Sequence, residues 1–87
     1  MLYGIYLPMS RTFLMTRRSK TRLDLKGIGE RIQELRGEIL QEVLAAHLGI
    51  SQGQLSKVER GKMAPTIDTL LRLSDRFGKS LDWIVKG

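Results

Sequence analysis

The sequence predicts an all-α fold, a compact bundle of five short helices between Gly27 and Lys86. Three observations support this prediction. From Ile28 onward, apolar residues recur at the spacing of three and four that places them on one face of a helix. Glycines, and Ser or Thr residues ahead of apolar runs, fall where helices would end and begin. No segment alternates apolar and polar residues in the manner of a half-buried strand.

The first two helices are each marked by an apolar stripe and a terminal glycine. The first is predicted from Ile28 and ends at Gly37, and the second covers residues 41–48 and ends at Gly49. Ala45 is predicted at the crossing of the second and third helices, where a larger side chain would push the two backbones apart. The predicted inward residues are Ile28, Ile32 and Leu35 in the first helix and Leu44, Ala45 and Leu48 in the second.

The last three helices each begin after a hydroxyl-bearing residue. Ser51 and Gln54 have the spacing of a capping box for the third helix, which ends near Gly61. Thr66 and Ser80 are the predicted caps of the fourth and fifth helices. The predicted inward residues are Leu55 and Val58 in the third helix and Ile67, Leu70, Leu71, Ser74 and Phe77 in the fourth. The fifth helix carries the apolar residues Leu81, Trp83 and Ile84.

Composition narrows the class of partner. The chain has 87 residues, enough for one domain, with 15 basic and 9 acidic side chains and a formal net charge of +6. This excess favours an anionic partner, either nucleic acid or an anionic membrane. There is no cysteine, which excludes disulfides, thiolate nucleophiles and the common zinc-finger ligand sets, and suits a reducing cytoplasm. We expect no metal site and no cofactor.

The basic excess is concentrated at the start of the chain. Residues 1–26 hold six of the basic residues and one acid, and are predicted to form a flexible arm ahead of a domain at residues 27–87. The apolar opening is too short to span a membrane and its positive charges follow it, so a signal peptide is not expected. The arm is interpreted either as a solvated tail or as a segment that follows phosphates or enters a groove. Two further interpretations are a peripheral membrane contact through Tyr3, Ile5, Tyr6 and Leu7, and a true start codon at Met9 or Met15.

The most specific pattern is QEVLAAHLGISQGQLSKVERGKMAP, residues 41–65. Two helices joined by a Gly-containing turn, the second opening with polar residues, form a helix-turn-helix arrangement. The segment closely resembles the Cro and phage-repressor type of helix-turn-helix regulator, an XRE-like family. The matching positions are Gln41, Leu44, Ala45, Leu48, Gly49, Ile50, Ser51, Leu55, Ser56, Glu59, Gly61 and Pro65. The resemblance extends over residues 27–86 and implies a lambda-repressor-like DNA-binding domain.

The resemblance also implies roles for individual residues. The third helix would lie in the major groove, with Gln52 as the leading base reader because its amide matches the N6 and N7 atoms of adenine. Gly53 would let the backbone approach the groove, and Lys57 would contact either guanine or a phosphate. The residues implied to position the DNA backbone are Gln41, Ser51, Gln54, Arg60 and Lys62. Arg36 and Glu59 match a largely buried ion pair between the first and third helices.

Several residues depart from the family pattern or carry no predicted chemistry. Leu40 stands where Ser or Thr normally caps the second helix, which calls that cap and one phosphate contact into question. Val43 is interpreted as a partner contact or a tolerated surface valine. His47 is predicted to be solvated. The acidic row of Glu30, Glu34 and Glu38 is predicted to be a solvated helix face, because it has neither a pocket nor a nucleophile beside it.

These features predict a sequence-specific double-stranded DNA-binding regulator, a repressor that acts as a homodimer. A small domain gains stability from pairing, and the fifth helix, with Leu81, Trp83, Ile84 and Val85, is the predicted dimer surface, although Trp83 is equally expected in the core. The alternatives are an antitoxin that binds a toxin through residues 1–26, and a protein-binding adaptor. No enzyme is expected, since no nucleophile, base and orienting group can be assembled.

Overall fold

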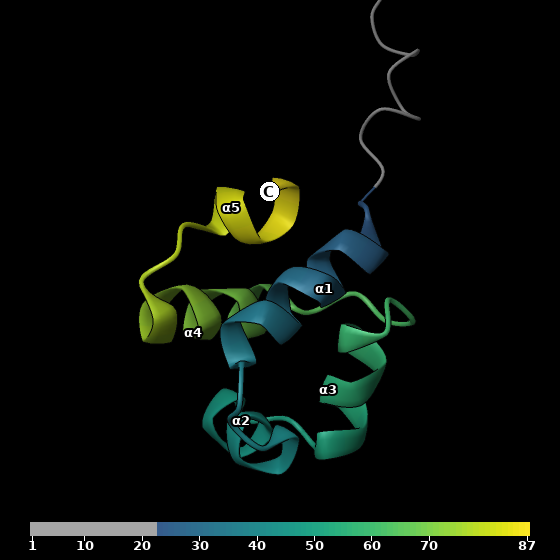
Figure 1. The fold of residues 1–87 in the computed structure, drawn as a ribbon, viewed down its shortest axis with the longest axis vertical. Helices are drawn as coiled ribbons and strands as arrows, with labels where there is room; N and C mark the ends of the chain where they lie inside the picture. Colours follow the sequence, from purple (N-terminus) through teal and green to yellow (C-terminus); the bar gives the residue numbers. More distant parts are fainter. Residues whose placement is uncertain (1–22) are drawn as a thin grey trace, which may run out of the picture.

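The computed structural model describes residues 23–87, which fold into five helices without a strand (Figure 1). The predicted all-α class is therefore confirmed. The helices are α1 at Leu25–Arg36, α2 at Gln41–Leu48, α3 at Gln52–Glu59, α4 at Ile67–Phe77 and α5 at Leu81–Lys86. None of the helices between residues 23 and 87 has the length and apolar content needed to cross a membrane.

The predicted helix starts agree with the structure except at α1. Ser51 and Gln54 form the predicted capping box, and the side chains of Thr66 and Ser80 cap α4 and α5. The first helix begins at Leu25 instead of Ile28, because the carboxylate of Asp24 accepts a hydrogen bond from the Gly27 N–H at 3.0 Å. The prediction was wrong here because it followed the apolar stripe, whereas the cap lies one turn ahead of it.

The core lies where α1 meets the other helices. In Figure 1, α1 passes between α5 and α3 and contacts both, while α2 packs against α3 and α4. The buried apolar residues of the core come from every helix. They are Ile28, Ile32, Leu44, Ala45, Leu48, Leu55, Val58, Leu70, Leu73 and Ile84. The predicted inward faces of α2 and α3 are thus confirmed.

The predicted inward face of α4 was wrong in part. Leu70 is buried as predicted, but Leu73 is the fully buried residue of this helix, while Ile67 and Leu71 are 68% and 51% exposed. Ser74 and Phe77 are half-buried. The cause is that apolar residues occupy more than one side of α4, so a second stripe, rotated from the predicted one, competes for the core.

The fifth helix is held by a residue of α1. Arg31 donates hydrogen bonds from Nε to the Ile84 carbonyl at 2.8 Å and from Nη2 to the Val85 carbonyl at 2.9 Å. Ile84 is fully buried, Trp83 and Val85 are half-buried, and Leu81 is 37% exposed. Ile84 was therefore predicted wrongly as part of a dimer surface, because it already packs in the core of the single chain.

A close backbone approach joins α1 to the end of α3. A Cβ atom added to Gly29 would lie 2.6 Å from the Val58 carbonyl oxygen and closer still to that of Glu59. Real Cβ atoms do not approach backbone oxygens this closely, so glycine is required for the two helices to pack as they do. The sequence pattern did not single out Gly29, although a glycine inside a helix is itself a signal of such an approach.

Candidate nucleic-acid interface

The helix-turn-helix unit consists of α2, residues 49–51 and α3. Gly49 has a φ of 73° and a left-handed conformation, which turns the chain between the two helices. Ala45 is 1% exposed in the core cluster that α2 and α3 share. The predicted turn is confirmed, and it places the start of α3 near the start of α2.

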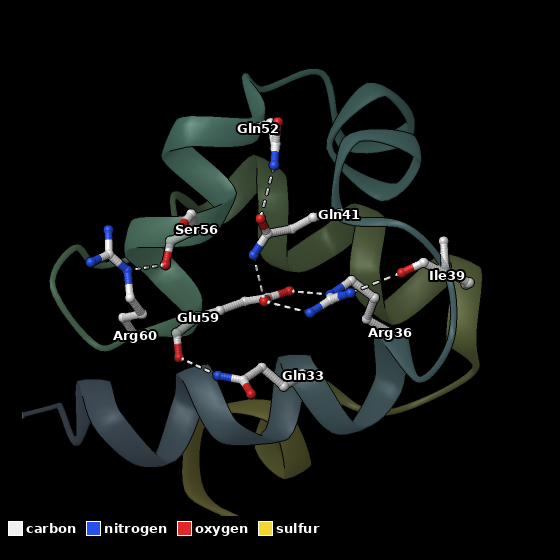
Figure 2. Close-up of polar contacts among 8 residues, drawn as sticks. All are labelled: Gln33, Arg36, Ile39, Gln41, Gln52, Ser56, Glu59 and Arg60. Atoms are coloured by element: carbon white, nitrogen blue, oxygen red, sulfur yellow. Dashed lines mark hydrogen bonds and ion pairs between the residues drawn. The ribbon is translucent and has the colours of Figure 1, made fainter.

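The two helices are joined by their first residues. Gln41 begins α2 and Gln52 begins α3, and the Nε2 atom of Gln52 donates a hydrogen bond to the Oε1 atom of Gln41 at 3.2 Å (Figure 2). Gln52 is exposed to solvent and Gln41 is half-buried. The side chain predicted to read a base is thus held from one side by an amide of the neighbouring helix.

Behind Gln41 lies a buried ion pair. The guanidinium of Arg36 donates from Nε to Glu59 Oε2 at 2.7 Å and from Nη2 to Oε1 at 3.0 Å. Gln41 Nε2 donates to the same Oε1 atom at 2.9 Å. Glu59 is only 3% exposed, and Gln33 also donates to its backbone carbonyl at 2.8 Å. In Figure 2, dashed lines join Arg36 to Glu59 and Glu59 to Gln41, and a separate line joins Gln33 to the Glu59 carbonyl.

We call Arg36, Glu59, Gln41 and Gln52 the amide relay. Its hydrogen bonds have a fixed polarity, because the Glu59 carboxylate can only accept and therefore selects the NH2 end of the Gln41 amide. The Oε1 atom of Gln41 is then directed to Gln52, which must donate. Gln52 is left with its own Oε1 atom and a second N–H, one acceptor and one donor, which is the pair that the major-groove edge of adenine complements.

The other polar residues near the start of α3 are partly engaged in capping. Ser51 Oγ accepts from the Gln54 N–H, and Gln54 Oε1 accepts from the Ser51 N–H, both at 3.0 Å. The Ser51 hydroxyl hydrogen and the Gln54 NH2 group make no bond between residues 23 and 87 and can still contact phosphates. Gly53 is exposed, and a Cβ atom there would meet only Ser51 Oγ at 3.9 Å, so packing does not require glycine at this position.

The predicted basic contacts lie towards the other end of α3. Lys57, Arg60 and Lys62 are all exposed at the surface, and no carboxylate between residues 23 and 87 forms a salt bridge with any of them. The Nε atom of Arg60 donates to the Ser56 carbonyl at 3.3 Å, so its guanidinium lies along the C-terminal turn of α3 (Figure 2). The polar residues predicted to contact DNA therefore form two groups. Amide and hydroxyl side chains lie at the starts of α2 and α3, and basic side chains lie at and beyond the C-terminal end of α3.

Two sequence departures have clear structural outcomes. Leu40 adopts the extended backbone of an N-cap, but its side chain makes no capping hydrogen bond, and it is 63% exposed. The sequence called a side-chain cap at this position into question, and the structure shows that Leu40 provides none. Val43 is 42% exposed. His47 is exposed as predicted and lines an open hollow with Arg72, Asp75 and Arg76.

Several predictions concern residues that the structure does not describe. The flexible arm, the phosphate-following or toxin-binding roles of that arm, the membrane contact at Tyr3, Ile5, Tyr6 and Leu7, and the alternative starts at Met9 and Met15 all lie wholly or mainly outside residues 23–87. Within the described part of the chain, no group of three or more His, Cys, Asp or Glu side chains has a metal-binding arrangement.

A helix-turn-helix family model matches residues 32–84, more than half of the chain. The chain belongs to the helix-turn-helix family. The resemblance to the Cro and phage-repressor type is confirmed, and the family is one of DNA-binding transcriptional regulators.

Two curated helix-turn-helix relatives carry regulator names. The chain is 38% identical over 61 residues to the SPbeta prophage-derived uncharacterized HTH-type transcriptional regulator YonR of Bacillus subtilis (strain 168), a match that covers 68% of this chain and 56% of that protein. It is 40% identical over 57 residues to the uncharacterized HTH-type transcriptional regulator y4dJ of Sinorhizobium fredii, which covers 63% of this chain and 74% of that one. The chain therefore spans little more than half the length of the Bacillus relative.

Solved structures of other helix-turn-helix proteins share the fold. The P22 c2 repressor, solved in complex with a synthetic operator, has a TM-score of 0.65 and 35% identity over 77% of this chain and 98% of that one. The restriction-modification controller protein C.AhdI of Aeromonas hydrophila has a TM-score of 0.62 and 28% identity over 70% of this chain and 91% of that one. These matches agree with the lambda-repressor-like fold implied by residues 41–65.

Proposed function

We propose that this helix-turn-helix protein is a cytoplasmic, sequence-specific double-stranded DNA-binding regulator that represses transcription as a homodimer. The observation that carries the proposal is the exposed Gln52 amide at the start of α3, held in one orientation by Gln41. In a helix-turn-helix, residues at the start of the second helix face the base edges of the major groove. The P22 c2 repressor, a solved neighbour, was crystallised with an operator.

In the proposed complex, Gln52 reads adenine through its free acceptor and its free N–H. Lys57, one turn or more along α3, contacts guanine or a phosphate. The residues that hold the domain on the DNA backbone are Gln41, Ser51, Gln54, Arg60 and Lys62. Gly53 lets the first turn of α3 approach the groove. Two copies would occupy half-sites about one helical turn (roughly 34 Å) apart and repress by covering a promoter.

The test is selection of bound sequences from a pool of random duplexes with the full chain. The wild type is expected to enrich a two-fold symmetric motif that contains adenine in each half-site. Gln52→Ala should lose the preference at that one base pair, by about 1–3 kcal/mol, and keep the remainder of the motif. Lys86→Ala serves as a control, because Lys86 lies in α5 and pairs with Asp82 there.

Two results would contradict the proposal. A wild-type chain that enriches no motif would not be a sequence-specific regulator. An unchanged motif for Gln52→Ala, with the fold intact by circular dichroism, would remove Gln52 as the base reader and leave the DNA-binding function to other residues.

A further inference from the structure

The outer face of α4 carries two large aliphatic side chains that the core does not use. Ile67 and Leu71 are 68% and 51% exposed, and they lie one helical turn apart, so they form a continuous surface. We call these two residues the α4 strip. Because Leu70 and Leu73 already fill the inward side of the helix, rotation of α4 cannot bury the strip without exposing the core.

Charges of both signs run beside the α4 strip. Asp68 and Arg72 each follow one strip residue along the chain, and Arg72 Nε lies 3.0 Å from Asp68 Oδ2. Both side chains are well exposed, Asp68 at 71% and Arg72 at 51%. Asp75 and Arg76 continue the alternation of sign towards the end of the helix. When two such helices lie antiparallel, the negative charges of one edge face the positive charges of the other. The surface is therefore complementary to a second copy of itself.

We infer that the α4 strip is the contact surface through which two copies of this chain pair. In a two-fold dimer the same patch of each copy meets the other. Two α4 helices packed antiparallel would bring the strips together and set Asp68 of each copy beside Arg72 of the second copy. A partner with a uniformly charged edge would instead repel one of these two groups. This inference rests on the dimer in the proposed function and names its surface.

The position of α4 is compatible with DNA binding by both copies. Its main contacts are with α5 and α2, and Figure 1 shows α3 and α4 on opposite sides of α1. Gln41 and Gln52 lie at the starts of α2 and α3, so the α4 strip does not overlap with the amide relay. Because the strip is small compared with a stable dimer interface, the dimer is expected to be weak and dependent on concentration.

The decisive experiment uses charge exchange between two variants of the full chain. Asp68→Arg places two cations beside the α4 strip, and Arg72→Asp places two anions there. Each variant alone should dimerise at least roughly tenfold more weakly than the wild type in sedimentation equilibrium, because like charges then face each other across the contact. An equimolar mixture should form a heterodimer near wild-type affinity. Contacts within one helix cannot explain this recovery, because residues 68 and 72 of each variant chain still carry the same charge in the mixture. The recovery must therefore come from contacts between the two chains.

A second variant tests the aliphatic contact. Leu71→Glu should weaken the dimer by roughly 100-fold, because it buries two carboxylates without partners. Val43→Glu is the matched control, since it introduces the same charge at another exposed aliphatic residue and should leave the dimer unchanged. Circular dichroism checks that both variants fold.

The outcomes separate this inference from the proposed function because sedimentation is done without DNA. A wild type that stays monomeric up to about 1 mM, a Leu71→Glu variant that dimerises like the wild type, or a charge-exchange mixture that fails to pair would overturn the α4 surface. A monomeric wild type would also remove the homodimer from the proposed function, whereas sequence selection by the wild type would stand in each case. A dimer that responds to these variants but enriches no DNA motif would support the surface and reject the regulator.

Discussion

At the scale of single residues, Glu59 links the stability of the domain to its candidate interface. Its carboxylate is 3% exposed and accepts hydrogen bonds from Arg36 and Gln41. A buried carboxylate of this kind is retained only with its partners in place, because an unpaired buried charge is costly. The same group fixes which end of the Gln41 amide reaches Gln52. One residue therefore serves packing and orientation together.

Glu59→Gln is expected to lower the free energy of unfolding by about 2–4 kcal/mol, since Arg36 loses its charge partner in a largely buried site. It should also weaken the base preference at Gln52, because an amide at position 59 no longer selects the NH2 end of Gln41. Urea denaturation measures the first effect and sequence selection the second.

Glu30→Gln provides the comparison. Glu30 pairs with Lys26 at 3.6 Å, but both side chains are mostly exposed, at 63% and 81%, so the change in unfolding free energy should stay below about 1 kcal/mol. A Glu59→Gln variant that is no less stable than Glu30→Gln would show that the buried pair contributes nothing.

At the scale of helices, the signals that specify α2 and α3 are local, and these elements could be predicted from the sequence. Gly49 ends α2 with positive φ, and Ser51 with Gln54 caps α3, all within a short stretch of chain. The inward side of α4 could not be predicted in the same way, because apolar residues lie on several of its sides. Contacts with α2, which is distant in sequence, and with the neighbouring α5 decide that Leu73 faces the core and Leu71 does not.

The Arg36–Glu59 ion pair was predicted from the sequence, but the hydrogen bonds that connect it to Gln41 and Gln52 were not. The family resemblance supplied Arg36, Glu59, Gln41 and Gln52 by position. The hydrogen bonds of Gln41 to Glu59 and of Gln52 to Gln41 depend on side-chain orientation between residues 18 and 11 positions apart. No local pattern encodes such an orientation. Gln41 was accordingly expected to meet phosphates, and its position between two side chains of the relay was not foreseen.

Helix packing makes opposite predictions for the same substitution at two glycines. Gly29→Ala should destabilise the domain by about 1–3 kcal/mol, because its Cβ would displace the end of α3 from α1. Gly53→Ala should stabilise it by up to about 1 kcal/mol, since alanine favours the helix and the added atom meets no backbone.

Thermal or urea denaturation of both variants checks the two signs. The Gly53→Ala variant should also bind DNA more weakly if glycine serves close approach to the groove. Equal effects of the two substitutions on stability would contradict the close approach of α1 to α3.

At the scale of the whole molecule, charge is distributed unevenly. Residues 1–22 contain five basic residues and no acid, which leaves ten basic and nine acidic residues, a net charge of +1, in residues 23–87. The folded domain therefore has little overall attraction for DNA. Its affinity should depend on where Lys57, Arg60 and Lys62 lie, and on the contribution of the basic segment before the domain.

Deletion of residues 1–22 tests that contribution. If the segment neutralises phosphates, the slope of log affinity against log salt concentration should become flatter by about 0.9 for each phosphate that the shortened chain no longer neutralises. The selected motif should not change, because phosphate contacts carry no sequence information. Titrations at several salt concentrations measure the slope, and a slope equal to that of the full chain would show that the segment does not contact DNA.

The amide relay has a consequence for genetics. Because the orientation of the surface amide is set by a carboxylate in the interior, alleles that alter regulation should arise at positions 36 and 59 as well as at position 52. Interior alleles of this kind would change which promoters are recognised. Higher expression of such a variant would restore the amount of folded protein but would not restore its DNA sequence preference.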